Sequence, residues 1–150
     1  MAGWNAYVDT QLVATGAVAA AGIFGRADMQ LYANANNLQM SAYKAKVTNE
    51  DGSEGEADIN EAAIWLGGYC SFTEEPSNGF RLGGEKYQVL REAEGPTIYL
   101  KKSTGGACVS YTNTLMIVGV RDDKANESSS LAACNKAVED LAEYLRSAGF

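Results

Sequence analysis

The sequence predicts an α+β domain, in which helices at both ends of the chain pack on a central antiparallel sheet. Residues 85–121 are rich in β-branched and aromatic side chains, and short turn signals divide them into segments, as in an antiparallel meander. Both ends of the chain instead show apolar residues at helical spacing. A length of 150 residues suits one domain, so we expect a single domain over residues 1–150.

The beginning of the chain predicts one helix followed by two strands. We expect the helix from Gly3 to about Val13, because its apolar side chains fall on one helical stripe. Residues 17–24 are small and apolar, as in a tightly packed central strand, and a turn then leads to a second strand over Met29–Ala33. The stripe of the first helix consists of Trp4, Tyr7, Val8 and Leu12.

The middle of the chain is polar and acidic. A short helix is predicted over 38–47, and a mobile loop over 48–56, because the latter segment has glycines and acids but no large apolar side chain. Asp58, with a second acid three residues later, resembles a capping box. It predicts a helix over 58–66 that ends at the glycine pair 67–68.

The second half of the chain predicts a meander and a final helix. The expected strands are Glu85–Arg91, Thr97–Lys101, Ala107–Thr112 and Leu115–Arg121. From about Ser129 the spacing of apolar residues becomes helical. The stripe expected to face the core consists of Leu131, Cys134, Val138, Leu141 and Leu145.

The chain contains no histidine, which removes several classes of enzyme and metal site. Ser-His-Asp and Cys-His catalysis, histidine-ligated zinc and an imidazole switch near neutral pH are excluded. Three cysteines are too few for a four-cysteine zinc site. We therefore predict neither an enzyme nor a bound metal or cofactor.

Two segments resemble ligand-binding loops but lack essential residues. In the glycine-rich stretch 79–86, Tyr87 stands where a phosphate-binding loop has Ser or Thr, and a β-rich segment follows instead of a helix. The acidic stretch 51–61 has Ala57 and Ala63 where a calcium-binding loop needs Gly and Glu. An acidic surface loop is the better interpretation of the second stretch.

The charge is unevenly distributed along the chain. The net charge is −7, and residues 47–80 carry eight acids and no base. An acidic total argues against binding of nucleic acid, which needs a basic surface. Seven of the twelve bases lie in residues 81–124, so one local basic face remains available for an acidic partner.

The cysteines and the hydropathy predict a cytoplasmic protein. Cys70, Cys108 and Cys134 are odd in number and far apart, as expected for reduced and mostly buried thiols. No apolar run approaches the roughly 20 residues that cross a bilayer. The first residues do not form a signal peptide, because polar side chains interrupt them.

Four stretches of the sequence resemble the profilin family. The first is the opening Met-Ala-Gly-Trp-Asn-Ala-Tyr-Val-Asp, and the second is the glycine-rich stretch 78–86, which resembles an Asn-Gly…Leu-Gly-Gly-x-Lys hairpin. The third is Lys-Ser-Thr-Gly-Gly-Ala at 102–107, and the fourth is the final helix, 134–150. The resemblance covers both ends and the central sheet, and residues 34–58 form an acidic insertion relative to the usual family pattern.

The resemblance implies a fold and a set of partners. The terminal helices would pack together on one face of the antiparallel sheet, with a short helix or helices on the other. Profilins bind monomeric actin, proline-rich segments of actin-assembly factors and phosphoinositide lipids, and they regulate actin polymerisation and nucleotide exchange. They act in the cytoplasm, associated with the cytoskeleton.

The resemblance also implies two sets of site residues. Tyr32 occupies a position where the family commonly has Trp. The implied poly-proline-binding residues are Trp4, Tyr7, Tyr32, Tyr144, Leu145 and Phe150. The implied actin-binding residues are Lys86, Arg91, Lys102, Asn135, Lys136 and Asp140.

The residues by themselves leave two alternatives open. Aromatic side chains at helical spacing usually pack helices on a sheet, so the terminal aromatic residues are either core or the walls of a surface groove. The rival function is that of a scaffold or regulatory domain that binds a protein other than actin through its sheet. Titration with monomeric actin separates the two functions.

Overall fold

The computed structural model describes residues 2–36, 38–40, 42–48, 51–61, 65, 80–82, 84–93, 97–127 and 129–150, with side chains except at 2–4, 47 and 89–93. In chain order its helices and strands are α1 (Ala2–Tyr7), the π-helical η1 (Val8–Leu12), the 3₁₀-helical η2 (Val13–Thr15), β1 (Ala20–Gly25), β2 (Leu31–Ala35), β3 (Ala42–Thr48), β4 (Glu54–Asn60), β5 (Phe80–Leu82), β6 (Glu85–Ala93), β7 (Thr97–Lys102), β8 (Gly105–Tyr111), β9 (Leu115–Asp122) and α3 (Leu131–Ser147).

The described strands form a seven-stranded sheet and a separate hairpin. The sheet has the order β2-β1-β9-β8-β7-β6-β5, and every neighbouring pair in it is antiparallel. The meander predicted from residue 85 onward is confirmed, since β6 to β9 follow one another in both sequence and space. The α+β fold class with a central antiparallel sheet is therefore confirmed.

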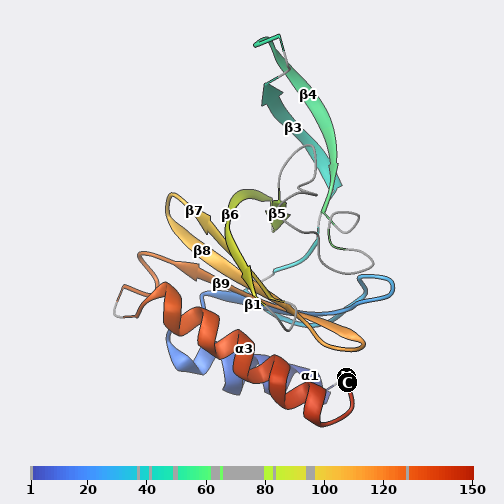
Figure 1. Ribbon diagram of the computed structural model, residues 1–150, viewed down its shortest axis with the longest axis vertical. Helices are drawn as coiled ribbons and strands as arrows, with labels where there is room; N and C mark the ends of the chain where they lie inside the picture. The colour runs from blue at the N-terminus through green and yellow to red at the C-terminus, as the bar shows by residue number, and fades with distance from the viewer. Residues whose placement is uncertain are drawn as a thin grey trace.

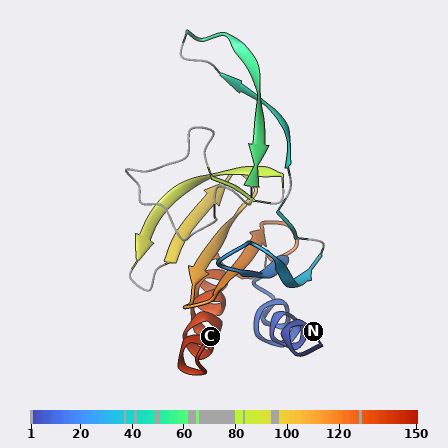
Figure 2. The same cartoon turned by 90° about the vertical axis from the view of Figure 1, so that its right-hand side faces the viewer.

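The two terminal helices lie on the same face of the sheet, as Figure 1 and Figure 2 show. The last helix, α3, packs on β8 and β9 and also contacts η1. Its predicted stripe is largely buried in the core on this side, together with Val8 and Leu12 of η1. The predicted N-terminal helix is divided into α1, η1 and η2, and it ends at Gly16, which has a φ of 78°.

A second core fills the opposite face of the sheet. Its largest member, Trp65, is fully buried, and its ring lies 5.2 Å from that of Phe80. The indole Nε1 donates to the carbonyl of Arg81 at 3.0 Å, and the hydroxyl of Tyr111 donates to the carbonyl of Trp65 at 3.2 Å. The backbone is helical at Glu61 and at Trp65, and the residues between them lie outside the described part of the structure.

The acidic middle of the chain differs from its predicted structure. The helix expected over 38–47 is wrong, because β3 pairs with β4 in register from residue 42 to residue 60. This pairing places Lys44 opposite Asp58 and Lys46 opposite Glu56, and such opposite-charge pairs favour a hairpin.

Two neighbouring predictions are wrong in part, because β4 occupies residues that were expected to form a loop and a helix. The helix expected over 58–66 does not begin at Asp58, because residues 58–60 belong to β4. The predicted loop over 48–56 contributes Thr48 to β3 and residues 54–56 to β4, and the described residues between the strands are 51–53.

The hairpin of β3 and β4 projects away from the sheet, on the side remote from α1 and α3 (Figure 1). The glycine pair 67–68 lies outside the described residues.

Two glycines in the Lys-Ser-Thr-Gly-Gly motif are required by packing rather than by backbone conformation. A Cβ at Gly105 would lie 2.0 Å from the carbonyl oxygen of Arg121 in the neighbouring strand β9. A Cβ at Gly106 would lie 2.8 Å from the carbonyl oxygen of Leu100 and 2.8 Å from the Leu131 side chain of α3. These glycines therefore allow β8 to approach both the adjacent strands and the last helix.

Candidate functional site

The aromatic side chains of the terminal helices meet at the surface. The rings of Tyr7 and Tyr144 lie with their centroids 5.9 Å apart and their planes tilted by 49°. Tyr144 is 54% exposed, whereas Tyr7 is half-buried and also packs against the core beneath the helices. The hydrogen bond between the two hydroxyls raises the pKa of Tyr7. The structure thus brings together two of the predicted poly-proline-binding residues.

A β-bulge in β2, the strand that contains Tyr32, sets the position of this side chain. Ile23 pairs with Ala33 and Phe24 with Leu31, which leaves Tyr32 without a directly opposed residue on β1. The Tyr32 phenol lies across the backbone of β1, because a Cβ at Gly25 would be 3.0 Å from its hydroxyl. Since α1 contacts β2, this 37% exposed ring lies on the strand beside the helix of Tyr7.

The last residue is held in place by backbone hydrogen bonds. The Phe150 N–H donates to the carbonyl of Leu145 at 2.9 Å, and the Asn113 N–H donates to the Phe150 carbonyl at 3.0 Å. Arg146 fastens the same end of α3 to β8, since its guanidinium donates to the Tyr111 carbonyl at 2.9 and 3.2 Å. Among the described residues, the large exposed apolar side chains are Leu31, Tyr32, Tyr144 and Phe150.

Two of the predicted groove residues contribute differently from the others. Leu145 is fully buried in the core beneath the helices, so it supports the aromatic surface from below and exposes no wall. Trp4 has its backbone in α1, but its side chain lies outside the described part of the structure. It precedes Tyr7 by three residues, a spacing that puts both on one side of a helix.

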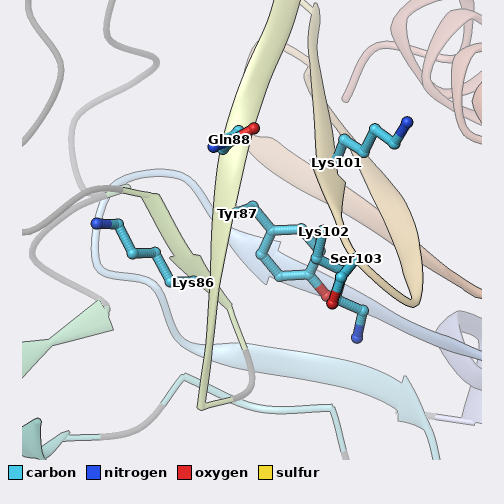
Figure 3. Close-up of a pocket in the computed structure, with 6 residues that line it drawn as sticks. All are labelled: Lys86, Tyr87, Gln88, Lys101, Lys102 and Ser103. Carbon is cyan, nitrogen blue, oxygen red and sulfur yellow. The ribbon is translucent and has the colours of Figure 1, made fainter.

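A second candidate surface surrounds the basic end of β6 and β7. An open depression of about 650 Å³ is lined by Lys86, Tyr87, Gln88, Lys101, Lys102 and Ser103 (Figure 3). Gln88 pairs with Lys101, so strand alternation puts Lys86 and Lys101 on one face of the sheet. The same alternation puts Lys102 on the other face, and Figure 3 shows Lys86 and Lys102 extending in different directions.

Lys102 is engaged within the protein. Its side chain is only 14% exposed, and its ammonium pairs with Glu85 and lies 5.3 Å from the centre of the Tyr87 ring. Burial disfavours the charged ammonium, but the hydrogen bond to Glu85 and the neighbouring Tyr87 phenol outweigh burial and raise the pKa of Lys102. Lys102 therefore presents little exposed charge for its predicted role in actin binding.

The polar residues predicted on the last helix lie near the same side of the sheet as Lys86. Tyr99 of β7 donates a hydrogen bond to Glu139 of α3, which ties the helix to this strand. The backbone of Arg91 pairs with Tyr99, although its side chain lies outside the described part. The three predicted helix residues are Asn135, which is half-buried, and the exposed ion pair Lys136–Asp140, with 2.7 Å between its charged atoms.

The described side chains show two features that bear on metal binding and thiol reactivity. They contain no group of three or more His, Cys, Asp or Glu residues that could hold a metal ion. Burial raises the pKa of Cys134 to about 12, and it raises that of Cys108 well above its usual range. Both thiols therefore stay protonated and unreactive. In the part of the chain that the structure describes, no helix has both the length and the apolar character to span a membrane.

One buried polar group escaped the sequence analysis. The spacing of Asp58 and Glu61 predicts a capping box, but the Glu61 carboxylate is fully buried at the root of the β3–β4 hairpin, where it contacts Tyr43 and Gly84. These two partners lie 18 and 23 positions away in the sequence, so no local spacing indicates them.

Comparison with known proteins identifies the family. The family model described as Profilin matches residues 2–150. The profilin of Tetrahymena pyriformis is 31% identical over 157 aligned positions, which cover 100% of both chains. Profilin-2 of Acanthamoeba castellanii is 31% identical over 147 positions, which cover 98% of both.

The fold comparison agrees with the sequence comparison. A crystal structure of Schizosaccharomyces pombe profilin superposes with a TM-score of 0.68 at 28% identity, and the match covers 98% of this chain and 99% of the other. The α+β architecture, the antiparallel sheet and the two terminal helices are thus shared with a solved profilin. With a family model that spans nearly the whole sequence, this chain belongs to the profilin family.

Proposed function

We propose that the chain binds monomeric actin and the proline-rich segments of actin-assembly factors, and that it regulates actin polymerisation and nucleotide exchange on actin. Members of its family are non-enzymatic actin-binding proteins, and the chain is proposed to act likewise without catalysis. Its proposed location is the cytoplasm, in association with the cytoskeleton.

The observation that carries the proline-rich site is the contact between Tyr7 and Tyr144, where the terminal helices meet. A polyproline II helix has three residues per turn and leaves its carbonyls free as acceptors. Aromatic faces pack on the proline rings, and hydroxyl donors reach the carbonyls. Tyr7, Tyr32 and Tyr144 each supply both a ring and a hydroxyl.

Two titrations test the proposal. Tryptophan fluorescence with poly-L-proline should show saturable binding, whereas a Gly-Ser peptide of equal length should produce none. Monomeric actin should bind with the same affinity in the presence of saturating poly-L-proline, because the two proposed sets of residues do not overlap, although both include residues of α3. Binding of poly-L-proline without binding of actin would favour the rival function, a scaffold for another protein.

The actin surface is proposed on the outer side of β6 and β7 and the exposed side of α3. The charge-reversal variant Lys86→Glu with Arg91→Glu should weaken actin binding by more than about tenfold, because like charges across an interface cost several kcal/mol. The single variant Lys86→Glu should change the stability little, since Lys86 is exposed and exposed charges contribute little to folding. Actin affinity is measured by titration, with poly-L-proline affinity as the internal control. An unchanged affinity for actin would remove this face from the proposal.

Phosphoinositide lipids are proposed as a third ligand, at the depression lined by Lys86 and Lys101. Each lysine near an anionic membrane contributes about 1 kcal/mol, so Lys101→Glu should weaken binding to phosphoinositide vesicles by at least about fivefold. Actin binding should be retained, because Lys101 is not among the proposed actin-binding residues. Co-sedimentation with phosphoinositide and with neutral vesicles measures the effect. Equal binding to both kinds of vesicle would contradict the lipid proposal.

A further inference from the structure

A buried carboxylate joins the projecting hairpin to the main sheet. Glu61 is fully buried, and its Oε2 accepts hydrogen bonds from the Tyr43 hydroxyl and the Gly84 N–H, both at 2.8 Å. Tyr43 belongs to β3 and Gly84 to the turn between β5 and β6, so one oxygen connects two separate parts of the fold. A buried charge needs such partners, because an unpaired carboxylate in the interior is very costly.

The positive partner in this cluster is Arg81 of β5. It is 8% exposed, and the Tyr43 hydroxyl is hydrogen-bonded to both Glu61 and Arg81. Arg81 stands directly opposite Lys86 in the pairing of β5 with β6. Two like charges at directly opposed positions of antiparallel strands repel each other. Glu61 and Arg81 meet at one shared hydroxyl, that of Tyr43.

The same carboxylate fixes the backbone next to Lys86. Gly84 has a φ of 88°, which suits the turn before β6, and its N–H is held by Glu61. Lys86 follows two residues later and is one of the residues that line the depression (Figure 3). Glu61 is therefore linked to Lys86 through the turn that precedes it, which the carboxylate holds at Gly84.

We propose that Glu61 is a positioning residue for the actin-binding surface, and that it acts through Lys86. This role rests on the proposed binding of actin. The Tyr43 hydroxyl and the Gly84 N–H donate to the same carboxylate oxygen. The root of the β3–β4 hairpin therefore belongs to the proposed positioning cluster.

A double-mutant cycle tests the role. The proteins are the unaltered chain, Glu61→Gln, Lys86→Ala and the combination of the two, each titrated with monomeric actin and with poly-L-proline. Glu61→Gln keeps the size of the side chain but removes its charge, and it should weaken actin binding about fivefold. Lys86→Ala should also weaken actin binding. This loss of affinity should be at least about threefold smaller when Glu61→Gln is already present, because the effects of residues that act through one another are not additive. Poly-L-proline affinity should stay the same in all four proteins.

Other outcomes overturn the role. If the two effects on actin affinity simply multiply, Glu61 does not act through Lys86. If poly-L-proline affinity falls together with actin affinity, Glu61 only maintains the fold. If Glu61→Gln does not fold, the milder Tyr43→Phe replaces it in the cycle. Tyr43→Phe should weaken actin binding about twofold, and the effect of Lys86→Ala should again be smaller in its presence. If the unaltered chain does not bind actin, the proposed function itself fails, which the first titration shows before any variant is compared.

Discussion

Gly105→Ala is expected to lower the free energy of unfolding by on the order of 3 kcal/mol. The added Cβ would lie 2.0 Å from the carbonyl oxygen of Arg121, and it would meet backbone rather than a flexible side chain. Either β8 or β9 must therefore move, and both lie in the middle of the sheet. Replacing glycine also restricts the unfolded chain, which favours folding by only about 0.4–1 kcal/mol, so the clash dominates.

Thermal unfolding followed by circular dichroism measures this loss. For a domain of this size, about 3 kcal/mol corresponds to a fall of roughly 10 °C in Tm. Thr104→Ala is the matched control, because Thr104 is exposed in the same turn and its backbone carbonyl, which accepts from Asp123 N–H, is unchanged by the substitution. The control should stay within about 0.5 kcal/mol of the unaltered chain. A Gly105→Ala protein as stable as the control would show that the strands separate at little cost.

Trp4→Ala is expected to weaken binding of poly-L-proline by about thirtyfold, which corresponds to about 2 kcal/mol. Trp4 lies three residues before Tyr7 in α1, and the ring of Tyr7 contacts the exposed ring of Tyr144. A large aromatic side chain at such a place supplies apolar area at low entropic cost, together with an indole N–H donor. Removing it should cost more than removing any one hydroxyl of the site.

The measurement is a calorimetric titration, because the substitution removes a fluorescent side chain. Gln11→Ala is the control, since Gln11 is exposed in the neighbouring η1. Actin affinity and the far-ultraviolet circular dichroism spectrum should be unchanged in both variants. If Trp4→Ala binds poly-L-proline as tightly as the unaltered chain does, Trp4 packs α1 against the sheet and does not belong to the poly-proline-binding surface.

The sequence predicts the sheet well where local signals and long-range pairing agree. Segments such as Thr97–Lys102 and Leu115–Asp122 are rich in β-formers and bounded by turns, and their strands form close to the predicted limits. The β3–β4 hairpin shows the opposite case. The Ala and Lys residues in 42–46 suit a helix locally, and pairing with residues 56–60 makes this segment a strand.

The candidate sites were predictable in part. The tyrosines of the terminal helices meet as the family resemblance implies, but the bulge that places Tyr32 follows from pairing that the sequence does not display. The internal pairing of Lys102 with Glu85 was also hidden, because the two residues are 17 positions apart. Helical spacing had assigned Leu145 to the core, and its full burial agrees with that assignment.

The shape of the hairpin has a practical consequence for labelling. Its tip, residues 51–53, is exposed, and it turns at Gly52, whose φ is 86°. Figure 1 shows this tip far from the helices that carry Tyr7 and Tyr144. Exposed loop tips of small and polar residues tolerate inserted sequence well. An epitope or a dye-bearing loop inserted at Gly52 would therefore report on the protein in cells, and both terminal helices would remain unencumbered.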